Sequence, residues 1–107
     1  MTLTDDLRWT PVGKVSEWKD GDGRPILIGA RRLGVYLHGG AFFALKDVCP
    51  HAGVALSQGP IVEGAVMCVG HGWTFDLKTG EVARGPGGYK VATYPVRVVD
   101  GTVEVGV

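Results

Sequence analysis

The stretch from Cys49 to His71 decides how this chain of 107 residues folds, because it holds two short motifs, Cys49-Pro50-His51 and Cys68-Val69-Gly70-His71. The two motifs contain both cysteines and two of the three histidines of the sequence, and sixteen residues lie between them. Cysteine thiolates and histidine imidazoles are strong ligands for transition metals. Two motifs that each supply one ligand of each kind therefore predict a single site with four ligands.

The residues around these motifs indicate loops rather than strand interiors. Pro50 cannot donate a ladder hydrogen bond, and Gly70 and Gly72 flank His71. Glycines allow the backbone to approach a bound group closely and to direct amide N–H groups at it. A third glycine-rich stretch, Arg84-Gly85-Pro86-Gly87-Gly88, could fold over such a group and limit its contact with water.

The ligand set fits a Rieske-type [2Fe–2S] cluster, in which two thiolates hold one iron and two imidazoles hold the other. Cys49 and Cys68 would then hold the first iron, and His51 and His71 the second. A zinc ion with the same four ligands is the main alternative, although zinc fingers usually pair Cys with Cys and His with His. A structural disulfide is disfavoured, since the cytosol keeps such cysteines reduced.

Composition narrows the class of protein. Eleven basic and eleven acidic residues give a net charge of +0, and no basic run is present, which argues against nucleic acid as a partner. No apolar stretch approaches the roughly 18 residues needed to span a bilayer. Residues 1–6 are polar and acidic, the opposite of a signal peptide, which predicts a cytoplasmic protein without a membrane partner.

Glycines and prolines divide the chain into short apolar segments, which predicts an all-β domain, a small sandwich or a partly open barrel. His38-Gly39-Gly40 and Asp100-Gly101 are expected hairpin turns, and residues 16–20 could form one helical turn. The expected strands are 24–30, 33–37, 41–45, 62–69, 73–77, 94–99 and 102–105.

The combined motifs make the chain resemble a Rieske ferredoxin. The residues of this resemblance are Cys49-Pro50-His51, Leu56-Ser57-Gln58-Gly59, Cys68-Val69-Gly70-His71-Gly72-Trp73, Phe75-Asp76, Thr79-Gly80 and Gly85-Pro86. The resemblance implies a single Rieske domain over residues 1–107, in which an antiparallel β-sandwich base carries a small inserted cluster-binding subdomain. The base would comprise residues 1–45 and 89–107, and the subdomain residues 46–88.

Two departures from the family pattern indicate the low-potential, oxygenase-associated type. Val69 and Gly70 replace the proline and the aromatic residue that usually stand between the cysteine and the histidine, so the loop is expected to be looser. High-potential respiratory relatives have an additional cysteine pair, and serine and tyrosine hydroxyls where this chain has Trp73 and Phe75. Hydroxyls that bond to cluster sulfur stabilise the reduced state, so their loss predicts a potential near the low end of the Rieske range, roughly −150 mV.

The resemblance implies an electron carrier rather than an enzyme. The chain would shuttle single electrons, as a monomer, from a flavin-dependent NAD(P)H reductase to a terminal ring-hydroxylating oxygenase. The alternative is a Rieske-type small subunit fixed in a larger oxidoreductase, such as an NAD(P)H-dependent nitrite reductase. Outside the motifs, His38 and the pair Arg31-Arg32 are interpreted as solvated turn and loop residues, and Trp73 as packing beneath the cluster loop.

Overall fold

Three antiparallel sheets make up the fold in our computed structural model, which describes residues 8–50, 53–70, 72–85 and 87–107. The first sheet has the order β1 (Trp9–Lys14), β11 (Thr102–Gly106), β10 (Val96–Val99). The second has the order β2 (Gly23–Ile28), β3 (Arg31–His38), β4 (Ala41–Lys46), β9 (Thr93–Tyr94). The third has the order β5 (Ile61–Val62), β6 (Ala65–Met67), β7 (Thr74–Asp76), β8 (Val82–Arg84). This architecture confirms the predicted all-β class.

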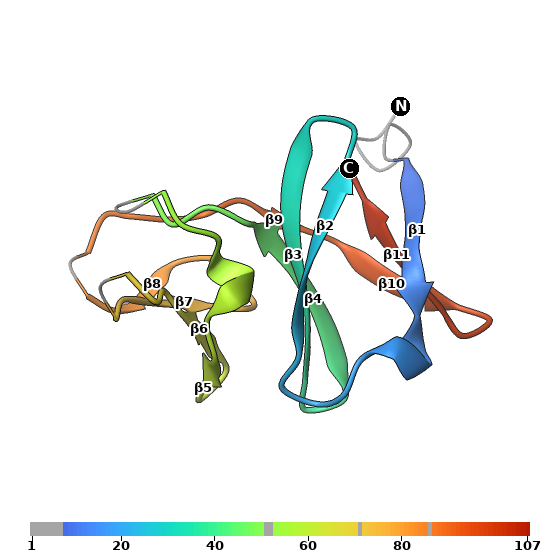
Figure 1. The fold of residues 1–107 in the computed structure, drawn as a ribbon, viewed down its shortest axis with the longest axis horizontal. Helices are drawn as coiled ribbons and strands as arrows, with labels where there is room; N and C mark the ends of the chain where they lie inside the picture. The colour runs from blue at the N-terminus through green and yellow to red at the C-terminus, as the bar shows by residue number, and fades with distance from the viewer. Residues whose placement is uncertain (1–7, 51–52, 71, 86) are drawn as a thin grey trace.

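The first two sheets lie together as a base, and the third sheet lies to one side of it with its loops pointing away from the base (Figure 1). Two short 3-10 helices, η2 (Val15–Glu17) and η3 (Leu56–Gln58), interrupt the strands. No helix in the described part of the chain has the length and apolar character needed to cross a membrane. The division of the chain at residues 46 and 88 stays a prediction.

Tight turns set the register of the two predicted hairpins. Gly39 and Gly40, with φ of 60° and 81°, join β3 to β4. Asp100 and Gly101, with φ of 50° and 76°, join β10 to β11. Positive φ at both central residues matches the right-handed twist of the flanking strands, which is why Gly-Gly and Asp-Gly predict such turns. Both hairpin predictions are confirmed.

The predicted strand 62–69 is wrong, because it contains a third tight turn. Glu63 and Gly64 have φ of 52° and 78° and separate β5 from β6. Glutamate rarely adopts positive φ, so Glu-Gly gives a weaker turn signal than Asn-Gly or Asp-Gly. The sequence analysis also missed β1, whose pairing with β11 is shifted between Pro11 and Gly13.

The central sheet is buried on both faces, which explains the continuous apolar run in β3. Leu33 and Val35 face a core inside the base, whereas Tyr36 faces a second core beneath the third sheet. The base core consists of Trp18, Leu33, Val35, Ala44, Val103 and Val105. The second core consists of Tyr36, Leu45, Cys49, Leu56, Val66, Cys68, Phe75, Leu77 and Val91. Both cysteines therefore lie in the second core.

Candidate metal centre

The loop at residues 49–54, here called the first loop, begins three residues after the end of β4 and is held by two backbone hydrogen bonds. The N–H of Cys49 donates to the carbonyl of Val54 at 2.8 Å, and the N–H of Gly53 donates to the carbonyl of Cys49 at 2.8 Å. These bonds tie both ends of the loop to its cysteine. The cysteine backbone is therefore fixed at the point where the loop leaves the sheet.

The loop at residues 68–73, the second loop, repeats this arrangement between β6 and β7. The N–H of Cys68 donates to the carbonyl of Trp73 at 2.7 Å, and the N–H of Gly72 donates to the carbonyl of Cys68 at 2.9 Å. The partners lie four and five residues after the cysteine in both loops. Two segments of different sequence thus hold their cysteines in the same hydrogen-bonded frame.

A glycine in the left-handed region closes each frame. Gly53 has a φ of 70° and Gly72 a φ of 76°. A residue with a Cβ pays a steric penalty there, which glycine avoids. Of these two glycines, the sequence analysis singled out Gly72, and both are favoured by the backbone conformation at these positions.

The two cysteine side chains are enclosed by protein. Cys49 is 1 % exposed and Cys68 is 0 % exposed, and no disulfide joins these two described residues. Both belong to one core together with Leu56 and Phe75. Two thiols brought to one buried place from two matching loops fit a metal group that needs a pair of thiolates.

Both predicted histidine ligands, His51 and His71, lie outside the described residues. Within the part of the chain that is described, no group of three or more His, Cys, Asp or Glu side chains gathers into a metal site. The complete four-ligand set therefore stays a prediction. His51 follows Cys49 by two positions, whereas His71 follows Cys68 by three.

A buried polar contact supports the first loop and was missed by the sequence analysis. Ser57 donates from its backbone N–H to Asp47 Oδ1 at 2.6 Å and from its hydroxyl to Asp47 Oδ2 at 2.6 Å. Asp47 is 2 % exposed, and its own N–H donates to the Arg32 carbonyl at 2.9 Å. This Asp47–Ser57 clasp joins the residues before the first loop to η3 after it. In the sequence, the only indication of this clasp is an aspartate two positions before Cys49.

Aromatic packing supports the second loop instead. The rings of Trp73 and Tyr89 lie 5.1 Å apart between centroids, at an interplanar angle of 53°. A Cβ added to Gly85 would lie 3.1 Å from Trp73 Cγ, so the third glycine-rich stretch passes close over this ring. The interpretation of Trp73 as a packing residue agrees with these contacts.

The hydroxyl of Tyr36 is buried close enough to Asp47 to feel its charge, but it forms no hydrogen bond with the Asp47–Ser57 clasp. Tyr36 is fully buried, and its hydroxyl has no hydrogen-bond partner among the described residues. Burial raises the pKa of Tyr36, and the negative charge of Asp47 raises it further. Tyr36 therefore stays neutral and adds no charge to the cysteine core.

Comparison with known proteins shows which protein family the chain matches. A family model described as the Rieske [2Fe-2S] domain matches residues 8–95. The anthranilate 1,2-dioxygenase ferredoxin subunit of Burkholderia cepacia is 34% identical over 107 residues, which cover 100% of this chain and 99% of that protein.

Solved structures show the same similarity. The fold matches a chain in the complex of reduced oxygenase and oxidized ferredoxin in carbazole 1,9a-dioxygenase with a TM-score of 0.84 and 33% identity, covering 91% of each chain. It also matches a protein of Mycobacterium tuberculosis assigned as an NADH-dependent nitrite reductase small subunit, with a TM-score of 0.86, 23% identity and coverage of 94% of this chain and 96% of that one. At that identity the second likeness concerns the fold alone.

Proposed function

The chain belongs to the Rieske [2Fe–2S] domain family, and we propose that it carries single electrons from a flavin-dependent NAD(P)H reductase to a terminal ring-hydroxylating oxygenase. Similar proteins are ferredoxin components of oxygenase systems, so the chain is an electron carrier and not itself an enzyme. Its cofactor is a Rieske-type [2Fe–2S] cluster. A zinc site made by the same residues does not agree with this family.

We assign the ligands as Cys49 and Cys68 on one iron and His51 and His71 on the other. The observation that supports this assignment most directly is the matching frame of the two loops, which places both buried cysteines in one core. A bound Rieske cluster accepts and releases one electron at a time, at a potential set by its ligands, hydrogen bonds and exposure to solvent.

The protein's own residues would enclose and orient this group. The frame hydrogen bonds fix the two thiolates, and apolar neighbours such as Leu56 and Phe75 keep water away from them. At the outer side of the second loop, Val69 is 55 % exposed beside the buried Cys68. Such an uncharged rim would let a partner approach closely over a small area, as suits a transient complex.

We also propose how the chain is divided, its oligomeric state and its location in the cell. Residues 46–88 would form the cluster-binding subdomain, and residues 1–45 and 89–107 the base. The chain would act as a monomer, because a shuttle must leave one partner before it meets the next. A cytoplasmic location goes with a reductase that draws on the NAD(P)H pool.

A fixed small subunit of a nitrite reductase is the second candidate, favoured only by the likeness of the fold. The two candidates differ in how the protein associates. A shuttle should purify alone as a red-brown monomer that a ferredoxin reductase can reduce. A fixed subunit should copurify tightly with a large catalytic subunit.

Cofactor analysis of the anaerobically purified protein tests the central assignment. We expect about two irons and two sulfides per chain, and dithionite reduction should give a Rieske EPR signal. Cys68→Ser should abolish the cluster, because one iron would lose a thiolate, whereas Val69→Ser should retain it. A colourless wild-type protein with one zinc would contradict the proposal.

A further inference from the structure

Three basic side chains gather where the base meets the first loop. Arg31 and Arg32 begin β3, Lys46 ends β4, and all three are exposed. They line a hollow of about 390 Å³, together with Ala30, Val48, Ala92 and Tyr94. We call this feature the basic hollow. Arg31 and Arg32 are thus strand residues at the rim of a concave surface, which corrects their interpretation as solvated loop residues.

The strand register places two of these charges close together. Leu33 lies opposite Lys46 in the β3–β4 pair, and Arg31 is two residues before Leu33. Residues two apart in a strand share a face, so Arg31 and Lys46 are diagonal neighbours on one face of the sheet. Two like charges at diagonal positions repel each other, so this pair adds nothing favourable to the sheet.

Arg32 lies beside Asp47, since the two residues share a backbone hydrogen bond and line a second hollow, whereas no acidic residue lines the basic hollow that holds Arg31 and Lys46. The ion pairs in the described part of the chain are Arg24–Glu17 and Arg97–Glu104. The nearest carboxylate in sequence, Asp47, is buried and accepts both of its side-chain bonds from Ser57. The positive charges of Arg31 and Lys46 are thus available to a partner.

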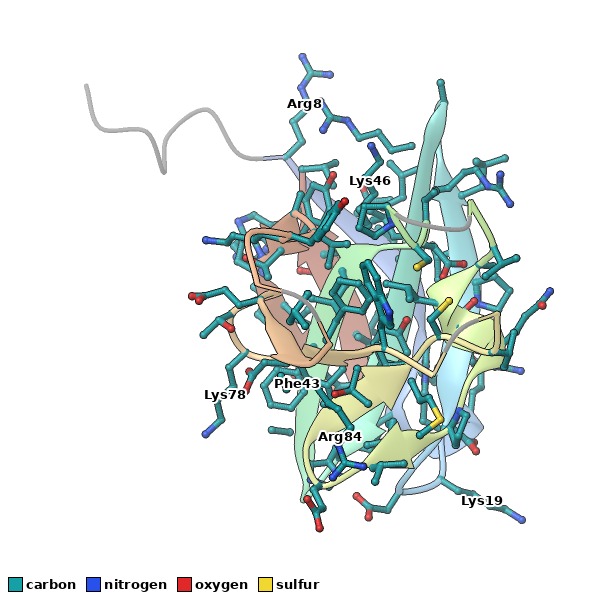
Figure 2. All side chains as sticks on the ribbon, turned by 90° about the vertical axis from the view of Figure 1, so that its left-hand side faces the viewer. Arg8, Lys19, Phe43, Lys46, Lys78 and Arg84 are labelled. Carbon is teal, nitrogen blue, oxygen red and sulfur yellow. The ribbon has the colours of Figure 1, made fainter. Side chains whose placement is uncertain are left out.

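Cations lie at both ends of the molecule, and carboxylates accompany the one at Lys19. Figure 2 shows Lys46 and Arg8 at one end of the molecule and Lys19 at the other. At the Lys19 end, Asp20 accepts the N–H of Gly39 and Asp22 accepts the N–H of Lys19, so carboxylates lie beside that cation. A local charge of one sign can orient an approaching protein even when the net charge is zero.

The basic hollow also adjoins the proposed metal centre. Val48 lines the hollow and directly precedes Cys49. A partner held by Arg31 and Lys46 would therefore rest beside Cys49. Charge complementarity across such a contact mainly raises the association rate and fixes the orientation of the complex.

Building on the proposed function, we propose that the basic hollow docks the acidic face of a redox partner protein, whose carboxylates surround the entry to its own cofactor. The partner's carboxylates would contact Arg31 and Lys46.

Binding of a fluorescently labelled octaglutamate peptide to the holoprotein tests this proposal by anisotropy. We expect binding at about 20 mM NaCl that weakens strongly at about 200 mM, as screening of exposed charges requires. Arg31→Glu/Lys46→Glu should weaken binding by about tenfold or more. The matched control Lys14→Glu/Lys19→Glu makes the same change in net charge at the other end of the base and should change it less than about twofold.

Three results would overturn the proposal: no binding by the wild type at low salt, equal weakening in both double variants, or tighter binding of an eight-residue oligothymidylate than of the peptide. The last result would assign the surface to nucleic acid. The EPR spectrum of both double variants should match that of the wild type. Loss of the cluster from the wild type would contradict the proposed function, whereas peptide binding tests the hollow alone.

Discussion

The first and second loops share a hydrogen-bonded frame but are supported by different chemistry. Behind the first loop, the Asp47–Ser57 clasp places a carboxylate and a hydroxyl in the core. Behind the second loop, Trp73 packs against Tyr89 and the third glycine-rich stretch. The comparison indicates that the frame alone fixes the cysteines, while the support behind each loop is free to differ.

The histidine offset is the second difference between the loops. His51 follows its cysteine by two positions and His71 by three, so the sequence offset differs although the described hydrogen bonds of the two loops match. Two thiolates and two imidazoles must reach two different irons in the proposed site. The described frames account for the positions of the two cysteines, and the two histidine ligands stay a prediction.

The largest expected effect on stability concerns the support of the first loop. Asp47→Ala leaves the buried N–H and hydroxyl of Ser57 without their acceptor, and bonds to charged groups contribute about 1.5–3 kcal/mol each. We expect the free energy of unfolding of the holoprotein to fall by about 3 kcal/mol in urea titrations. Asp20→Ala, which removes one exposed bond to Gly39, is the control. Equal losses in both variants would mean that the clasp is not a main support.

The two frames themselves can be compared through their glycines. A Cβ at Gly53 or Gly72 would meet no atom within 4 Å, so substitution by alanine tests backbone strain alone. We expect each alanine variant to lose about 1–2 kcal/mol of unfolding free energy. Gly87→Ala, which also adds a Cβ in open space but at a position without positive φ, should be nearly neutral. Unequal losses for Gly53 and Gly72 would show that the two frames differ in rigidity.

The apolar side chains near the second loop should keep the reduction potential of the proposed cluster low. Phe75 is 0 % exposed and shares a core with both cysteines, so Phe75→Tyr would place a hydroxyl in that core. A hydroxyl that bonds to cluster sulfur or a thiolate stabilises the reduced state. At about 1 kcal/mol per bond, the midpoint should rise by about 40 mV in redox titrations. Trp73→Ser should also raise it, and an unchanged midpoint in both variants would refute this reason for a low potential.

The smallest effect concerns Tyr36, beside the clasp of the first loop. Because burial raises its pKa above the ordinary 10.0, its contribution to stability is complete below pH 10 and is lost as the pH rises further. The wild type should therefore lose more unfolding free energy between pH 9 and pH 11 than Tyr36→Phe. Identical pH dependence in the two proteins would mean that Tyr36 ionises without unfolding.

The sequence predicted the parts of the fold that short, characteristic turn sequences specify. Alternating apolar residues around Gly39-Gly40 and Asp100-Gly101 gave both hairpins, because those dipeptides adopt positive φ readily. The turn at Glu63-Gly64 was missed because glutamate gives little warning of that conformation. β1 was missed because Pro11 and Gly13 interrupt its pattern, and its pairing with β11 joins the two ends of the chain.

For the site, the ligand assignment from the sequence stays a prediction, and the structure adds that both cysteines lie in one buried core with a support that the sequence did not indicate. The spacing of the motifs indicated the ligands, whereas the shared frame of the loops depends on hydrogen bonds between backbone atoms that the side chains do not reveal. The Asp47–Ser57 clasp joins residues ten positions apart through a 3-10 helix, and a buried aspartate is not expected from sequence alone.

The most direct test of the central claim counts the nitrogen ligands of the reduced protein. If His51 and His71 complete the site that the two loops prepare, pulsed EPR should detect two coupled ¹⁴N nuclei, and His51→Ala or His71→Ala should each remove this pattern or the cluster itself. The control His38→Ala, a change in the β3–β4 hairpin, should leave both nitrogen couplings intact. A spectrum without nitrogen coupling, or one that either histidine variant leaves unchanged, would contradict the account.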